Sequence, residues 1–346
     1  MAEQPDDYAL IIGLNDYPDY GSEGRSLQGA RADAEAFAAW ARDDDRGGGV
    51  PESHLATLFS APDGSAPDRR DIDMELSGLR KDSEKNGARR LYFYFSGHGQ
   101  AKSTGDVALC LPHWSIDFRH AALSLTRYRE FLMDCTHFAE VMMFLDCCRI
   151  RKVDASGSGS ELACAKPTAT ATTRRHMVAF ASEFQNPAFE AEIQDGVSDE
   201  EGPLVRGHFT RGLLTGLWGA AADDTGGVPL RNLKAHLEKE VPRLADAAGH
   251  TQYPQVLDDF PEANQPVFGT ATPVSTAQVT IMFTSGRTGE VVLEDGNMDV
   301  VHHGPAESSP WTLDLGRGWY HLREASSGAE RSFRCVPEEG AIDVEF

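Results

Sequence analysis

The fold of this protein is decided by residues 140–149, which read EVMMFLDCCR. Residues 141–145 form an apolar run that is too short for a typical helix and that favours a strand buried on both faces. The run ends in Asp146, two cysteines and Arg149, a group of side chains that packing alone does not explain. Because ligands bind at the carboxyl edge of open α/β sheets, we expect the chemistry of the protein at this strand end.

A second stretch, residues 91–99, has the same design and reads LYFYFSGHG. A cysteine thiol becomes a nucleophile only as the thiolate, so it needs a base nearby. His98 can be that base for Cys148 if the two strands are neighbours, because both loops then open at the same edge of the sheet. An oxyanion formed during acyl transfer also needs hydrogen-bond donors. The backbone N–H groups of Gly99 and Cys148 are the donors that we expect.

Alternating strands and helices over the first three quarters of the chain predict an α/β fold with a mostly parallel sheet flanked by helices. Buried-strand patterns lie at residues 8–14, 54–60, 91–95, 107–111, 141–145 and 177–181, and helical periodicity at 27–41, 71–85, 126–135, 209–218 and 230–244. Residues 154–173 (DASGSGSELACAKPTATATT) have little to bury, so we expect a mobile linker. Six short strand patterns after residue 271 predict a small C-terminal β-sandwich over 271–346, whose default role is to bind a partner protein.

The composition excludes several classes of function. The 346 residues carry a formal net charge of −22, which argues against nucleic acid and anionic membranes as partners. The acidic N-terminus leads directly into a strand, and no apolar run reaches membrane-spanning length, so we expect a cytoplasmic protein. The six cysteines lack CxxC spacing, and we expect them to be reduced, with Cys135 as a packing residue and Cys164 exposed in the linker.

These motifs resemble the caspase-like cysteine peptidases, and within them most closely the metacaspases and bacterial orthocaspases. His98 precedes Cys148 by 50 residues, and a histidine about 50 residues upstream of the cysteine is a feature of caspases. Further matches are residues 9–17 (ALIIGLNDY), 27–34 (LQGARADA), 207–214 (GHFTRGLL) and 252–255 (QYPQ). The resemblance covers residues 7–268 and implies a large-subunit-like part (1–150), the flexible linker (151–175) and a small-subunit-like part (176–268).

The resemblance also implies roles for individual residues. It implies Cys148 as the nucleophile, because the family pattern is Asp-x-Cys, and His98 as its catalytic partner. It places substrate-binding acids at Asp33, Asp146 and, less directly, Glu190, and hence implies protein substrates that are cleaved after exposed Arg, then Lys. A planar guanidinium satisfies paired carboxylates best. No cofactor is required, and calcium is left open because the acidic runs at 43–45 and 199–201 lack EF-hand spacing.

Basic residues on both sides of the linker are candidate self-cleavage sites: Arg149, Arg151, Lys152, Arg174 and Arg175. The chain departs from the family at Arg149, where many members have His. This departure motivates an alternative, a catalytically silent caspase-like scaffold whose β-sandwich binds a partner. Dinucleotide binding is disfavoured because the first strand is not followed by GxGxxG. By analogy with bacterial relatives, we expect a role in stress or defence.

Overall fold

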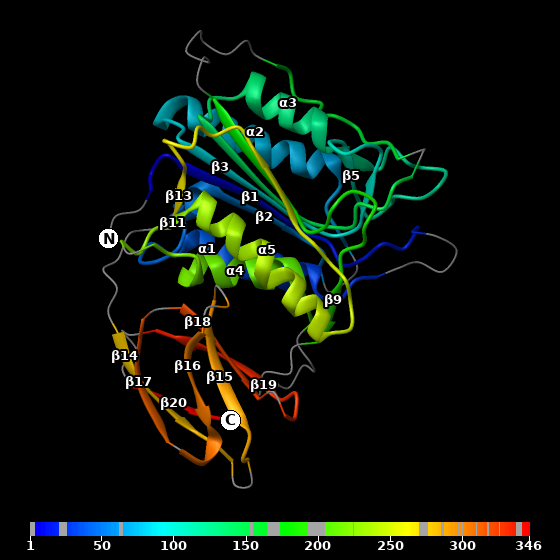
Figure 1. The fold of residues 1–346 in the computed structure, drawn as a ribbon. Helices are drawn as coiled ribbons and strands as arrows, with labels where there is room; N and C mark the ends of the chain where they lie inside the picture. Colours follow the sequence, from blue (N-terminus) through cyan, green and yellow to red (C-terminus); the bar gives the residue numbers. More distant parts are fainter. Residues whose placement is uncertain are drawn as a thin grey trace. The chain divides into compact units, whose positions relative to one another are not determined.

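Figure 1 shows a computed structural model of the protein. The structure describes residues 4–20, 26–61, 65–152, 155–164, 174–192, 205–223, 225–269, 276–284, 287–296, 298, 300–308, 310–316, 318–324, 326–336 and 341–346. The chain forms two compact units, of which one consists of residues 1–211 and 241–264 and the other of residues 212–240 and 265–346.

The first unit is built on a six-stranded sheet in the order β12-β8-β7-β3-β1-β2. Its strands are β1 (Asp7–Gly13), β2 (Leu55–Phe59), β3 (Arg90–Ser96), β7 (Glu140–Asp146), β8 (Arg175–Phe180) and β12 (Gln255–Asp258). All neighbouring pairs are parallel except β12 with β8. β3 is buried along its whole length and β7 beyond its first residue, as expected for central parallel strands. The predicted α/β fold with a mostly parallel sheet is confirmed.

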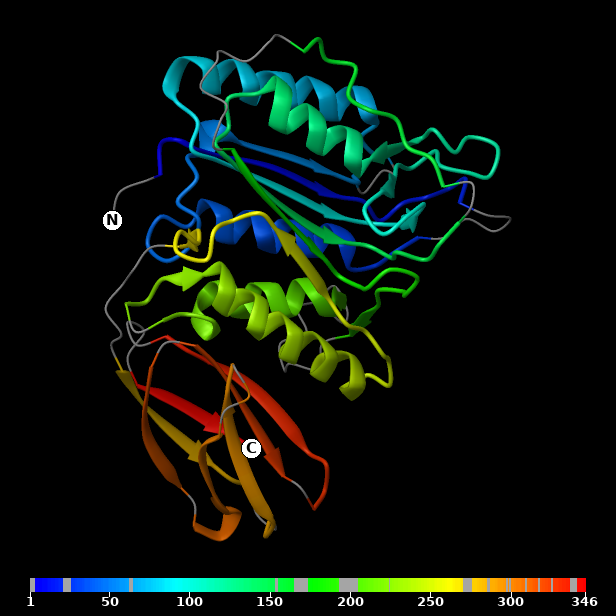
Figure 2. The same cartoon turned by 45° about the horizontal axis from the view of Figure 1, so that its top comes forward.

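Helices cover both faces of this sheet. In Figure 1, and in the turned view of Figure 2, α2 (Arg69–Asn86) and α3 (Leu125–Cys135) lie on one face and α1 (Ala30–Arg42) on the other. α2 begins two residues before the predicted start, because Asp68 and Asp71 form a capping box there. α4 (His208–Thr215) continues into a π-helical turn at Gly216–Ala220, and α5 spans Leu230–Ala247. No helix of the described ranges is long and apolar enough to cross a bilayer.

Three small sheets complete the connections. β4 (Gly99–Ala101), β5 (Val107–Cys110) and β6 (Ala122–Ser124) form an antiparallel sheet directly after the SGHG loop. β9 (Glu190–Glu192) pairs with β10 (Val205–Gly207), and β11 (Val228–Pro229) pairs with β13 (Val267–Phe268). The first of these sheets extends from β3, and it therefore helps to hold His98 in place.

The C-terminal part of the second unit contains two β-sheets with a common apolar core. Their orders are β17-β14-β20 and β16-β15-β18-β19, and Ile281, Leu293, Leu322 and Val344 are core residues from both. The strands are β14 (Thr276–Met282), β15 (Glu290–Asp295), β16 (Val300–Pro305), β17 (Trp311–Gly316), β18 (Gly318–Glu324), β19 (Glu330–Cys335) and β20 (Ile342–Glu345). The sandwich-like fold is confirmed. β16 was not predicted, because this edge strand (VVHHGP) buries none of its residues fully.

The expectation that all cysteines are reduced is wrong for two of them. Cys135 at the end of α3 and Cys164 form a disulfide, with Cα atoms 4.8 Å apart. Cys110, Cys147 and Cys335 are buried thiols outside any disulfide, and Cys148 is a half-buried one. The pairing could not be predicted, because it depends on the path of the chain between residues 135 and 164.

The expectation of a mobile linker is also wrong for residues 155–164, which are bound to the body of the first unit. The N–H of Ser158 donates to the carbonyl of Ala122, and the N–H of Glu161 donates to Asp73 at 2.8 Å. The disulfide fixes the end of this segment at Cys164. Residues 153–154 and 165–173 of the expected linker lie outside the described ranges.

Candidate active site

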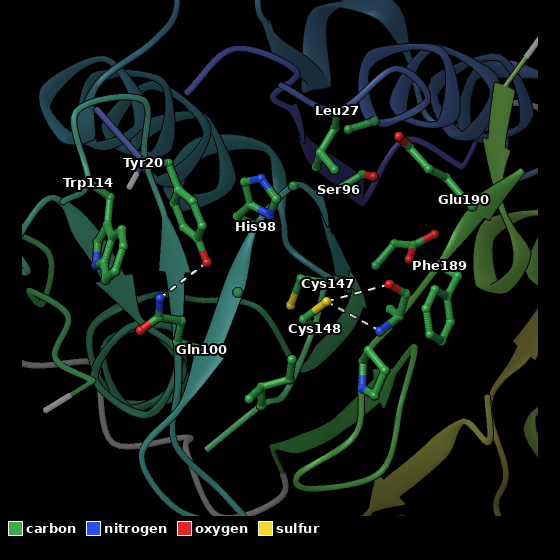
Figure 3. Close-up of a pocket in the computed structure, with 18 of the residues that line it drawn as sticks. Tyr20, Leu27, Ser96, His98, Gln100, Trp114, Cys147, Cys148, Phe189 and Glu190 are labelled. Carbon is green, nitrogen blue, oxygen red and sulfur yellow. Dashed lines mark hydrogen bonds between the residues drawn. The ribbon is translucent and has the colours of Figure 1, made fainter. Parts of the chain in front are cut away.

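The register of two central strands brings His98 and Cys148 to the same edge of the sheet. Ser96 at the end of β3 pairs with Asp146 at the end of β7. His98 lies two residues after Ser96, and Cys148 lies two residues after Asp146. The N–H of Gly97 donates to the carbonyl of Asp146 at 3.1 Å, which ties the two loops together. Both side chains line one cavity of about 900 Å³ (Figure 3).

His98 is held through its main chain and its ring. Its N–H donates to the Tyr17 hydroxyl at 2.9 Å, and that hydroxyl donates to the carbonyl of Cys110 at 3.2 Å. The N–H of Cys110 in turn donates to the carbonyl of His98 at 2.9 Å. The imidazole stacks on the ring of Tyr20, with centroids 4.3 Å apart and planes 17° apart. The position and the plane of the imidazole are therefore both fixed.

The two adjacent cysteines lie in different environments. Cys147 is 3% exposed within the core, and burial raises the pKa of its thiol well above the usual range, so it stays neutral. Cys148 lines the cavity, and its Sγ accepts a hydrogen bond from the N–H of Ala188 at 3.3 Å. A Cβ on Gly99 would lie 2.6 Å from the sulfur of Cys147. Only glycine at position 99 therefore allows the chain after His98 to approach the cysteine loop this closely.

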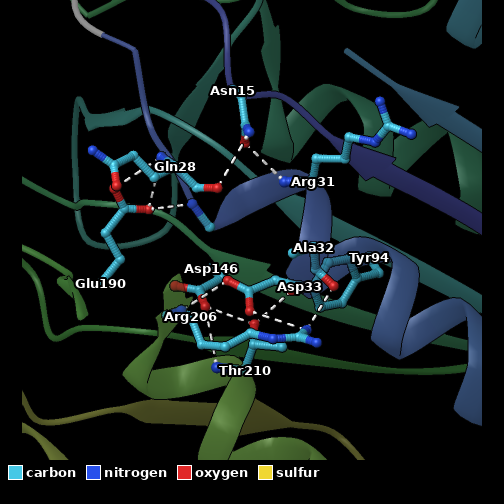
Figure 4. Close-up of polar contacts among 12 residues, drawn as sticks. Asn15, Gln28, Arg31, Ala32, Asp33, Tyr94, Asp146, Glu190, Arg206 and Thr210 are labelled. Carbon is cyan, nitrogen blue, oxygen red and sulfur yellow. Dashed lines mark hydrogen bonds and ion pairs between the residues drawn. The ribbon is translucent and has the colours of Figure 1, made fainter. Parts of the chain in front are cut away.

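Two buried carboxylates line the same cavity, and Figure 4 shows their polar contacts. Asp33 lies on the buried face of α1 and is 1% exposed, and Asp146 is 7% exposed. The N–H of Gly207 donates to Asp33 Oδ2 at 2.9 Å, and the N–H and hydroxyl of Thr210 donate to Asp146 Oδ2 at 3.1 and 2.6 Å. A Cβ on Gly207 would clash with both carboxylates, so they lie close together on either side of this glycine.

The electrostatics of this pair favour a cationic ligand. Burial raises the pKa of Asp33 well above its usual range, and the charge of Asp146 raises it further. Arg206 opposes this shift only in part, because its Nη1 lies 3.6 Å from Asp33 Oδ1. Burial also raises the pKa of Asp146, to about 6, although the bonds from Thr210 oppose the shift. Asp33 Oδ1 is buried and accepts no hydrogen bond from the described part of the chain.

Glu190 lies at the rim of the cavity and links the pocket wall to the start of α1. Its carboxylate accepts hydrogen bonds from the N–H of Gln28 at 3.0 Å and of Gly29 at 2.8 Å. A carboxylate is favourable at a helix N-terminus, where the backbone N–H groups have no partner within the helix. Its charge contributes to the raised pKa of both Asp33 and Asp146. The structure thus brings all three predicted acids into one cavity.

Residues 6–264 match the family model of the caspase domain of C14 peptidases. The chain belongs to the caspase-domain family. The caspase domain spans about three quarters of the 346 residues and makes the protein a cysteine-type peptidase, which confirms the resemblance seen in the motifs. The match is compatible with the metacaspase branch and does not distinguish it. No curated protein sequence matches the chain significantly.

Arg149, the departure from the family pattern, is a fully buried residue of this caspase domain. Its guanidinium packs on the ring of Phe180 at 3.8 Å and donates to the carbonyl of Ser182 at 2.9 Å and to Gln255 Oε1 at 2.8 Å. It also donates to the carbonyl of Thr104. Arg149 is inaccessible in the folded protein, which contradicts its prediction as a self-cleavage site.

The other four candidate cleavage sites differ in accessibility. Arg151 and Lys152 are exposed, and Lys152 also lines the cavity. Arg174 is half-buried and donates from Nη1 to the carbonyl of Met133. Arg175 is the first residue of β8. All four stay predictions, because accessibility alone does not make a cleavage site.

Sequence reasoning missed the residues that hold the pocket wall opposite His98. Gln252 accepts a hydrogen bond from the N–H of Phe189 at 2.9 Å and donates to the carbonyl of Ala181 at 3.0 Å. The QYPQ motif was a signal for it, but the motif did not reveal its partners. His250 stacks on Phe189, with centroids 4.2 Å apart, and its Nδ1 lies 3.2 Å from His208 Nε2. Burial lowers the pKa of His208 to about 4.

The described residues contain no group of three or more His, Cys, Asp or Glu side chains that could hold a metal ion. In the acidic run at 43–45, the carboxylate of Asp43 accepts hydrogen bonds from the backbone N–H groups of Asp45 and Arg46. The second acidic run, at 199–201, lies outside the described ranges. The caspase chemistry itself needs no cofactor.

Proposed function

We propose that the protein is a Cys–His endopeptidase that hydrolyses peptide bonds after Arg and, less readily, after Lys. The observation that carries this proposal is the buried Asp33 Oδ1, which accepts no hydrogen bond from the described residues and has only the distant Arg206 guanidinium, at 3.6 Å, as an ion-pair partner among them. It lies beside Asp146 in the cavity of Cys148. A guanidinium offers several N–H donors in one plane, and its charge offsets the cost of burying two carboxylates. An ammonium offers the charge without the planar fork, so Lys is the weaker ligand.

In the proposed mechanism, the Cys148 sulfur attacks the carbonyl carbon of the substrate Arg residue while the thiol proton passes to His98. The N–H groups of Gly99 and Cys148 stabilise the negative oxygen that forms. The C–N bond then breaks, and His98 gives its proton to the leaving amine. A water molecule, deprotonated by His98, attacks the thioester; the new carboxyl group leaves, and the proton returns to the thiol.

We further propose regulation by self-cleavage after Arg151, Lys152, Arg174 or Arg175. The exposure of Arg151 and Lys152 supports the first two sites. Residues 7–268 would then be a peptidase domain of two associated parts, and the β-sandwich over 271–346 would bind a partner protein. A cytoplasmic stress or defence role, by analogy with bacterial metacaspases, completes the proposal.

Reporter peptides that end in Arg, Lys or Asp before the fluorophore test the specificity. We expect the pure protein to cleave the Arg peptide fastest, the Lys peptide more slowly and the Asp peptide not at all. Cys148→Ala should abolish cleavage and prevent labelling by an arginyl electrophile, whereas the buried Cys147→Ala should keep both. A preference for Asp would overturn the proposal that an acidic pocket selects the substrate.

The same labelling experiment distinguishes the scaffold alternative. A silent scaffold predicts no labelling of Cys148 in the wild type. The alternative was motivated by Arg149, whose buried hydrogen bonds now account for its presence at this position. The described residues therefore offer no observation that favours the scaffold over the enzyme.

A further inference from the structure

The cavity continues beyond His98 on the side away from the acidic residues. Figure 3 shows Tyr20 and Trp114 on one side of His98, and Glu190 and Phe189 on the other. Tyr20 stacks on His98, and the ring of Trp114 lies 4.8 Å from that of Tyr20. The amide of Gln100 donates to the Tyr20 hydroxyl at 3.2 Å and fixes this ring. The three rings therefore form a continuous wall that begins at the imidazole.

The rest of this wall is apolar, with a basic rim. Ile116 lines the cavity although the residue is 66% exposed. The carbonyl of Ile116 accepts a hydrogen bond from Arg119 Nε at 2.8 Å, so a basic residue lies at the edge. Lys152 also lines the cavity, and its N–H donates to the carbonyl of Ala101, next to Gln100. We name Tyr20, Trp114 and Ile116 the apolar shelf.

The proposed chemistry decides which part of a substrate meets this shelf. The residue before the scissile bond occupies the acidic end of the cavity, with Asp33 and Asp146. The leaving amine receives its proton from His98, so it must lie on the side of the imidazole. The residue that follows the scissile bond therefore leaves the reaction centre across His98, toward the apolar shelf.

We propose that the apolar shelf is a binding site for the residue after the scissile bond and that it selects a large apolar or aromatic side chain there. This inference rests on the proposed cleavage after Arg and adds a second specificity determinant to it. Burial of such a side chain against Tyr20, Trp114 and Ile116 removes apolar surface from water. The charges of Arg119 and Lys152 at the rim disfavour Lys or Arg at the same position.

Internally quenched peptides test the proposal. They carry Arg before the scissile bond and Phe, Gly or Lys after it, and kcat/KM is measured for the full-length protein. We expect the Phe peptide to exceed the Gly peptide roughly tenfold, since hydrophobic pockets discriminate by this order, and the Lys peptide to be slowest. Ile116→Asp places a charge on the shelf without touching the core, and it should remove the preference for Phe. Phe118→Asp is the matched control, because Phe118 is 71% exposed on the same loop and does not line the cavity.

An arginyl methyl ester separates this inference from the proposed function. Its leaving group is too small to reach the shelf, so wild type and Ile116→Asp should hydrolyse it equally. Ester hydrolysis combined with equal cleavage of the Phe and Gly peptides would overturn the shelf and leave the Arg specificity intact. A preference for Phe that persists in Ile116→Asp would also overturn it. Absence of any cleavage after Arg, in ester and peptides alike, would overturn both.

Discussion

Replacing Asp146 by Asn should make the protein more stable and at the same time less active toward Arg substrates. Asp146 is buried, and burial raises its pKa to about 6, so at pH 8 the folded protein holds a costly negative charge. Asn has nearly the same shape, and its side-chain oxygen can still accept the hydrogen bonds that Thr210 donates. The substitution thus removes the charge and keeps the packing.

The size of the stability gain follows from the pKa shift. The folded state binds the Asp146 proton more tightly than the unfolded state does, where the pKa is the usual value of about 3.9. The charge therefore costs nothing well below pH 4, and its cost grows until the pH has passed about 6. A shift of two pKa units corresponds to about 3 kcal/mol at pH 8, and to roughly half of that at pH 5.

The loss of activity follows from the proposed salt bridge to the substrate. Removing one partner of a buried charge pair costs about 2–5 kcal/mol. We therefore expect kcat/KM toward an Arg peptide to fall by roughly 30-fold to several thousand-fold. The variant should thus gain stability and lose activity. A variant that merely misfolds would lose both.

The assay combines urea unfolding at pH 5 and pH 8 with cleavage of the Arg peptide at pH 8. Glu35→Gln is the matched control, because Glu35 lies on α1 two residues after Asp33 and its side chain is 46% exposed. It should change neither stability nor activity measurably. If Asp146→Asn proves no more stable than the wild type at pH 8, or if its gain is equally large at pH 5, the account of this buried charge is wrong.

Three further predictions concern pH, the Arg149 contacts and the disulfide. Cleavage of an Arg peptide should increase as the pH rises through about 6, since Asp146 binds a cation only when it is ionised. Labelling of Cys148 by iodoacetamide, an uncharged reagent that does not need the acidic pocket, is measured over the same pH range. It shows how much of the increase is due to ionisation of the thiol instead. Arg149→Lys keeps the charge without the planar fork of donors, so kcat should fall at least about tenfold while KM for the Arg peptide changes little. Arg151→Lys, at an exposed side chain, should change neither kcat nor KM. If self-cleavage occurs after Lys152, the two pieces should stay joined by the disulfide of Cys135 on a non-reducing gel and separate after reduction. In Cys135→Ser, the pieces should separate without reductant. Wild-type pieces that separate without reductant would contradict the pairing.

The central strands and the common sheet edge of His98 and Cys148 could be predicted, because their signals are local. The apolar runs before Asp146 and before Ser96 are continuous, and both end abruptly in reactive residues. Once the strands are neighbours, the pairing of Ser96 with Asp146 brings His98 and Cys148 together without further assumptions. The burial of Asp33 fits its spacing on α1, three residues after Ala30 and one before Ala34 on the buried face.

The rest depends on contacts between distant residues. Arg149 follows Cys148 in the sequence, but its partners at Ser182 and Gln255 lie 33 and 106 residues further along the chain. The docking of residues 155–164 depends on the acceptor Asp73, which lies 88 residues before Glu161. No periodicity or composition of the linker reveals such a partner, because a short polar segment looks the same whether it is solvated or bound.

The loop that carries Cys148 is closed by partners from the later part of the chain. The N–H of Arg149 donates to the carbonyl of Asn186, the N–H of Gln185 donates to the carbonyl of Arg149, and the N–H of Ala188 donates to the sulfur of Cys148. A polypeptide that ends near residue 152 would contain both His98 and Cys148, and we nevertheless expect it to be inert. Expressed together with a second polypeptide from residue 174 onward, it should recover turnover, so the enzyme is a natural candidate for fragment complementation.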